Sequence, residues 1–77
     1  MNAYDPRETQ EARYLAQELM KIVGAFPKEE QELFRLKFIL DLSYREMAAL
    51  LEKSEGALRV AVSRLKRKIQ SRFHHHA

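Results

Sequence analysis

The stretch from Ser43 to Arg72, SYREMAALLEKSEGALRVAVSRLKRKIQSR, decides the fold of this chain. Its first part predicts a helix over residues 44–51, because Ser43 and Glu46 have the S/T-x-x-E spacing of a capping box. The apolar residues of this helix recur at i, i+3 and i+4, which places them on one face: Met47, Leu50 and Leu51.

A second, longer helix is predicted over residues 55–72, after a tight turn at residues 52–54. Ser54 is its predicted N-cap, since a serine hydroxyl can accept a hydrogen bond from the amide of Gly56 or Ala57. Aliphatic residues follow at steps of four, three and four, and most other positions are basic or polar. The predicted inward stripe consists of Leu58, Val62, Leu65 and Ile69.

A basic amphipathic helix by itself usually means a solvated surface over a core. Here a capped helix and a short turn precede it, and that combination favours a helix-turn-helix. In such a motif the second helix enters the major groove of DNA while the first crosses the backbone.

Composition limits the possible classes of protein. The 77 residues suffice for one domain, and the chain has no cysteine, so disulfides and cysteine-based metal sites are excluded. No apolar run approaches the ~20 residues of a membrane span, and the N-terminus does not resemble a signal peptide. We therefore expect a cytoplasmic protein without a membrane partner.

The net charge of +3 is divided unevenly along the chain. Residues 1–42 contain eight acidic and six basic side chains, a net charge of −2, whereas residues 43–77 contain three and eight, a net charge of +5. This asymmetry indicates a polyanionic partner for the second half.

The first half predicts two further helices. Asp5-Pro6 is a typical helix start, and Leu15, Leu19, Ile22 and Val23 have helical spacing up to a predicted C-terminal cap at Gly24. Tyr14 and Met20 are expected in or near the core. A second helix is predicted over residues 28–40, after Pro27, and its apolar excess indicates a central position or a partner-binding patch.

The predicted fold is therefore all-α, with four helices in a single domain over residues 1–77. We expect an ordered core over about residues 7–72 and a frayed tail over residues 73–77. The three consecutive histidines of that tail do not form a preorganised metal site, and no metal or cofactor is predicted.

Three runs of sequence resemble region 4 of bacterial RNA polymerase sigma factors, most closely the extracytoplasmic-function group. FPKEEQELF at 26–34 is similar to the family's Leu-Pro-x-x-x-Arg-Glu-Val-Phe, and DLSYREMA at 41–48 to its Gly-Leu-Ser-Tyr-x-Glu-Ile-Ala. SEGALRV at 54–60, followed by RLKRKI at 64–69, is similar to its Ser-Glu-Gly-Thr-Val-Lys-Ser and the basic run after it. The resemblance covers about residues 11–72.

This resemblance implies a four-helix domain that recognises the −35 promoter element in the major groove and binds the flap of the polymerase β subunit. By position, it implies base contacts from Glu55, Gly56, Ala57, Arg59, Val60 and Ser63, and phosphate contacts from Ser43, Tyr44, Arg45, Arg64, Arg67 and Lys68. Ser54 and Lys66 complete the predicted DNA-binding set.

The chain departs from the family pattern in its turn and on its second helix. Glu52 replaces a glycine, so we expect a differently shaped turn, and Lys53 replaces an apolar plug. Val60 and Ala61 replace polar or basic residues near DNA. The sequence also lacks the domain that melts the −10 element, which predicts either an excised domain or a small stand-alone relative.

Two functions from different classes fit these observations. The first is a DNA-binding module of transcription initiation. The alternative is an adaptor or regulator that binds RNA polymerase, or another sigma or anti-sigma factor, with little sequence-specific DNA recognition. A dimeric response-regulator type of helix-turn-helix shares the Leu-Ser-x-x-Glu-Met-Ala pattern but not the Phe26-Pro27 opening. An enzyme is not predicted, because histidine occurs only in the tail and no Gly-rich phosphate loop is present.

Overall fold

The computed structural model describes residues 6–76, with side chains described from residue 10 to residue 73. Four α-helices follow one another: α1 (Pro6–Gly24), α2 (Lys28–Phe34), α3 (Tyr44–Leu51) and α4 (Glu55–His76). A π-helical turn, η1 (Arg35–Ile39), continues directly from α2. Within residues 6–76 there is no strand, so the all-α prediction with four helices is confirmed.

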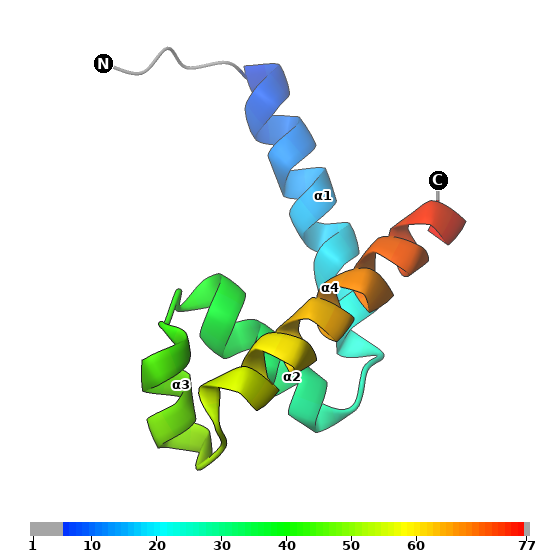
Figure 1. The fold of residues 1–77 in the computed structure, drawn as a ribbon. Coiled ribbons are helices and arrows are strands. Elements are labelled where there is room, and N and C mark those ends of the chain that lie inside the picture. Colours follow the sequence, from blue (N-terminus) through cyan, green and yellow to red (C-terminus); the bar gives the residue numbers. More distant parts are fainter. Residues whose placement is uncertain (1–5, 77) are drawn as a thin grey trace.

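Helix α4 is the element against which α1, α2 and α3 all pack (Figure 1). Its predicted inward stripe is confirmed: Leu58, Val62 and Leu65 are each 1% exposed, and the half-buried Ile69 packs against the same core. The helix is unbroken at Ala61. The body is flat, with extents of 42 × 35 × 16 Å.

Both predicted caps of the helix-turn-helix are present. The Glu46 amide donates to Ser43 Oγ at 3.0 Å, and the Ser43 amide donates to Glu46 Oε1 at 2.8 Å. The hydrogen bond from the Ser43 amide, together with the Ser43 side chain, holds the pKa of Glu46 below its usual value. At the start of α4, the Ala57 amide donates to Ser54 Oγ at 3.1 Å. These caps fix where α3 and α4 begin.

The turn between α3 and α4 keeps a left-handed residue although it has no glycine. Glu52 adopts φ 55° and ψ 45°, so the expectation of a differently shaped turn is wrong. The Glu52 amide donates to the Ala48 carbonyl, and the Lys53 amide reaches the same oxygen at 3.3 Å. These bonds hold the turn in its strained conformation. Lys53 borders an adjoining hollow of about 500 Å³, whose apolar wall includes Leu33, Leu51 and Leu58.

The substitution Glu52→Gly is expected to stabilise the domain by about 1 kcal/mol, because glycine adopts φ above zero without the clash of a Cβ atom. Urea unfolding followed by circular dichroism measures the change. Glu11→Gly, at an exposed position within α1, is the matched control and should destabilise the domain by up to about 1 kcal/mol. Equal effects of both substitutions would show that the turn is not strained.

The second predicted helix ends earlier than expected. Residues 28–40 were predicted as one α-helix, but α2 stops at Phe34 and the backbone widens, with the Leu40 amide donating to the Arg35 carbonyl at 2.9 Å. Asp41 then adopts φ 55°. The consequence is outward exposure of three large apolar side chains: Phe38 (40%), Ile39 (53%) and Leu40 (50%).

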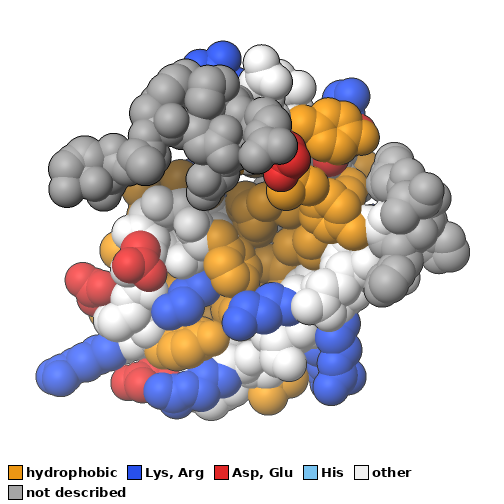
Figure 2. All heavy atoms as spheres, turned by 90° about the horizontal axis from the view of Figure 1, so that it is seen from above, with side chains coloured by type: hydrophobic (Ala, Val, Ile, Leu, Met, Phe, Trp, Pro, Cys, Tyr) orange, Lys and Arg blue, Asp and Glu red, His pale blue; other side chains and the backbone are white. Residues whose placement is uncertain are grey.

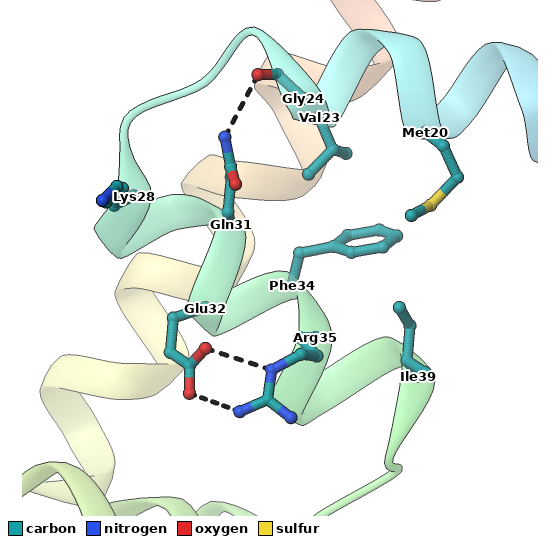
Figure 3. Close-up of a pocket in the computed structure, with 9 residues that line it drawn as sticks. All are labelled: Met20, Val23, Gly24, Lys28, Gln31, Glu32, Phe34, Arg35 and Ile39. Carbon is teal, nitrogen blue, oxygen red and sulfur yellow. Dashed lines mark hydrogen bonds and ion pairs between the residues drawn. The ribbon is translucent and has the colours of Figure 1, made fainter.

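The predicted start and end of the first helix are confirmed, because α1 runs from Pro6 to Gly24; Asp5, its predicted cap, lies outside the described residues. Gly24 is the last residue of α1, as predicted, although no described glycine has a positive φ. The Gln31 side chain donates to the Gly24 carbonyl at 3.1 Å (Figure 3). In the same view Glu32 and Arg35 form a two-fold hydrogen bond on the outside of α2 and η1, with one N···O distance of 2.6 Å.

The core contains fewer residues of α1 and α3 than the sequence predicted. Ile22, Val23 and Met47 are buried, but Leu15 and Leu50 are 53% and 62% exposed. Tyr14 and Met20, which we expected in or near the core, are 62% and 54% exposed. The first part of α1 extends away from the body (Figure 1), and within the described residues its apolar side chains Tyr14 and Leu15 stay exposed.

At the other end of the chain, α4 continues past the predicted boundary at Arg72 to His76. Phe73, which we assigned to the tail, packs against the core. The histidine side chains lie outside the described part of the structure. None of the helices in residues 6–76 has both the length and the hydropathy of a membrane span.

Candidate nucleic-acid interface

The outer face of α4 lies opposite its buried stripe. Successive residues of an α-helix are rotated by about 100°, so the stripe through Leu58 and Val62 leaves a second set pointing away from the core. We use "outer face" for five residues, all of them exposed: Gly56, Val60, Ser63, Arg64 and Arg67. This face therefore presents two guanidinium groups on a rigid helix, beside one apolar side chain.

Arg59 borders the outer face on the side of α3. Its guanidinium carbon lies 4.9 Å from the centre of the Tyr44 ring, and its Nη2 lies 3.9 Å from Glu55 Oε1. Lys37 also approaches the Tyr44 ring, at 4.2 Å, and donates to the Leu42 carbonyl at 3.0 Å. Cations over an aromatic face are attracted by its negative charge density, so Tyr44 holds both basic groups beside the start of α3.

The remaining predicted DNA contacts lie at the starts of α3 and α4. Ser43 and Arg45 are exposed next to the half-buried Tyr44. The oxygens of Ser43 and Ser54 accept the capping hydrogen bonds, but each hydroxyl still has its own hydrogen to donate. Glu55 and Ala57 are also exposed, in the first turn of α4. One contiguous surface thus includes the starts of both helices of the motif.

Two predicted contacts lie on the flanks of α4 instead of its outer face. Lys68 Nζ is 2.7 Å from Glu30 Oε1 and 4.4 Å from the centre of the Phe26 ring, so it faces α2. Lys66 lies on the opposite flank, 5.7 Å above the Phe38 ring. The helical rotation explains both positions, because each lies about one step of 100° from the stripe. Both lysines already have protein neighbours in the free molecule.

Lys37 is the basic group of this surface that the sequence did not indicate. It comes seven residues before Tyr44 and belongs to η1, whose widened backbone was not predicted from the sequence.

Within the described residues, no group of three His, Cys, Asp or Glu side chains is arranged to hold a metal ion. The chemistry of this surface is that of charge, hydrogen-bond donation and one apolar contact.

A family model described as "Sigma-70, region 4" matches residues 16–69. The match extends from the second half of α1 through α2, η1 and α3 to Ile69 of α4, and so includes the whole helix-turn-helix. No curated protein and no solved structure matches the chain. Because the match covers most of the 77 residues, the chain belongs to the sigma-70 region 4 family of transcription-related DNA-binding domains.

Proposed function

We propose that this domain binds promoter DNA by placing α4 in the major groove at a −35-type element. The observation that carries the proposal is the unbroken α4, whose aliphatic stripe faces the core and leaves Arg64 and Arg67 directed away from it. Guanidinium groups suit this role because they donate to phosphates and to guanine edges without accepting.

The starts of α3 and α4 determine how the domain would lie on the duplex. Recognition helices contact base edges mainly through their first turns, while the preceding helix crosses the phosphate backbone. In this orientation Gly56 and Val60 face the bases. Arg45, with the Tyr44-bound Arg59, lies towards the phosphates of one strand. The +5 charge of residues 43–77 supports binding of DNA by this half of the chain.

Binding to DNA duplexes at increasing salt tests this function. A duplex selected from a random pool should bind the domain in a 1:1 complex, and the logarithm of its association constant should fall linearly with the logarithm of the salt concentration. Fluorescence anisotropy of labelled DNA measures both. The proposal fails if neither the selected duplex nor any promoter duplex shows salt-sensitive binding.

A second surface supports binding to RNA polymerase. The N-terminal part of α1 and the end of α4 diverge in a V, and apolar side chains gather in the hollow between them (Figures 1 and 2). We call this hollow the V groove. It has a volume of about 540 Å³, and its apolar lining includes Leu19, Met20, Phe38, Ile39, Ile69 and Phe73. Exposed apolar surface of this kind is typical of a protein interface, and we propose that the polymerase β flap occupies it.

The substitution Ile39→Asp is expected to abolish capture of the domain by the β flap, because it places a charge in the apolar groove. Leu50→Asp is the matched control: Leu50 is 62% exposed on α3, does not line the groove, and should leave capture unchanged. Pull-down with the isolated flap measures both, and circular dichroism confirms folding.

Sequence-selective DNA binding by the wild type separates the two functions. Both predict loss of capture by Ile39→Asp. An adaptor that binds polymerase, a sigma factor or an anti-sigma factor, without base recognition, also predicts no sequence-selective DNA binding by the wild type. If folded Ile39→Asp still binds the flap, the V groove is not the binding surface.

A further inference from the structure

The outer face of α4 begins with a segment that cannot form hydrogen bonds to bases through its side chains. Val60 is 49% exposed on this face, with Gly56 one turn before it and Ala57 beside it. The nearest polar side chain on the face, Ser63, comes almost one turn later. Arg59, the basic neighbour, is held against Tyr44 at 4.9 Å and towards Glu55 at 3.9 Å. On the outer face itself, an apolar contact is therefore what the first turns of α4 offer to a partner.

Gly56 is not explained by the fold. A Cβ atom added to it would have nothing within 4 Å, and its φ is not positive. Glycine in the middle of a helix destabilises a protein by roughly 0.5–1 kcal/mol relative to alanine. Gly56 lies in the first turn of α4, where its cost is smaller, but it has no packing gain within the described residues. What glycine does provide is a low helix surface directly before Val60, which lets another molecule approach the backbone closely.

The only apolar group on base edges in the major groove is the C5-methyl group of thymine. Resting on the proposed binding of α4 in the major groove, we propose that Val60 packs against a thymine methyl group. Gly56 permits the close approach that this contact needs. The domain therefore distinguishes a T·A pair at this position by an apolar contact, while Arg64 and Arg67 contact the phosphates or guanine edges next to it.

Uracil substitution tests this contact, because deoxyuridine differs from thymidine only by the absent methyl group. In the duplex selected for wild-type binding, each thymine is replaced in turn by uracil. We expect one position at which the affinity falls roughly 3- to 5-fold, the effect of one buried methyl group. With Val60→Ala, the same uracil should have little further effect, because the two changes remove one interaction.

Ser63→Ala is the control for this pair. It lies on the same face but should retain the full uracil effect, since its contact is a different one. The contact is excluded if wild type is insensitive to uracil at every thymine, or if Val60→Ala retains the whole penalty. These outcomes leave the proposed function standing, because the domain still binds DNA; loss of all DNA binding by wild type would remove both.

Gly56→Ala tests the close approach separately. The variant is expected to unfold at the same or a higher urea concentration than wild type, because alanine is the better helix residue. Its affinity for the selected duplex should nevertheless fall, since the new methyl group separates α4 from the bases. Unchanged DNA affinity in the folded variant would show that Gly56 does not serve the contact.

Discussion

Met47→Ala is expected to destabilise the domain by about 2–5 kcal/mol, the usual range for removing a large aliphatic side chain from a core. Met47 is 0% exposed and lies in the same core cluster as the α4 stripe. A chain of this length buries a modest core, and single domains are stable by only about 5–15 kcal/mol. This loss is a large share of the total stability, so the variant should melt at least about 8 °C below the wild type. Circular dichroism during heating measures the difference.

Met20→Ala provides a control with identical chemistry. Met20 is 54% exposed at the edge of the V groove, so its truncation should change stability by no more than about 0.5 kcal/mol. The comparison isolates burial as the cause, because both substitutions remove the same atoms. Similar losses in the two variants would contradict the placement of Met47 at the centre of the core.

The sequence was sufficient to predict the elements whose signals are local. The aliphatic spacing in α4 predicted its buried stripe, and Ser43 with Glu46 predicted a capping box that the hydrogen bonds confirm. Both signals depend on residues within one or two helical turns of each other. Packing of the whole domain does not need to be known for such predictions to succeed.

Features that depend on distant neighbours were not predictable in this way. Lys68 and Glu30 are 38 residues apart, and their ion pair directs a predicted phosphate contact towards α2. The exposure of Leu15 has the same origin, since periodicity shows which side of α1 is apolar but not how far the body extends along it. A residue pattern defines a face, and only the tertiary contacts decide whether that face is covered.

Two residues adopt the left-handed conformation although neither is a glycine. Asp41 and Glu52 both adopt φ 55°, and in the resemblance to sigma region 4 each occupies a position where the family has glycine. Glycine adopts a positive φ without strain, so the glycines of the family pattern imply a left-handed residue at both turns. Flanking helices anchored by caps and a buried core hold these residues in place despite the backbone strain.

Removing both guanidinium groups of the outer face is expected to have the largest effect on DNA binding. If Arg64 and Arg67 each neutralise one phosphate, Arg64→Ala/Arg67→Ala should lower the slope of log K against log salt by about 1.8. Each contact contributes about 0.9 logarithmic units of affinity per decade of salt below 1 M. At 0.1 M salt, one decade below, the loss of two contacts should therefore lower the affinity roughly 60-fold. Anisotropy titrations between 50 and 200 mM salt would measure both quantities.

A charge-matched variant decides whether position or net charge causes this loss. Arg13→Ala/Lys21→Ala also removes two positive charges, but from exposed positions on α1. This helix packs against α4 and does not contribute to the outer face. Only a non-specific electrostatic contribution should be lost there, and it is screened over about 10 Å at 0.1 M salt. A small change in slope for the α1 pair and a large one for the α4 pair would place the phosphates at the outer face. Equal losses would instead mean that the domain attracts DNA through its overall charge, with no defined orientation of α4 in the groove.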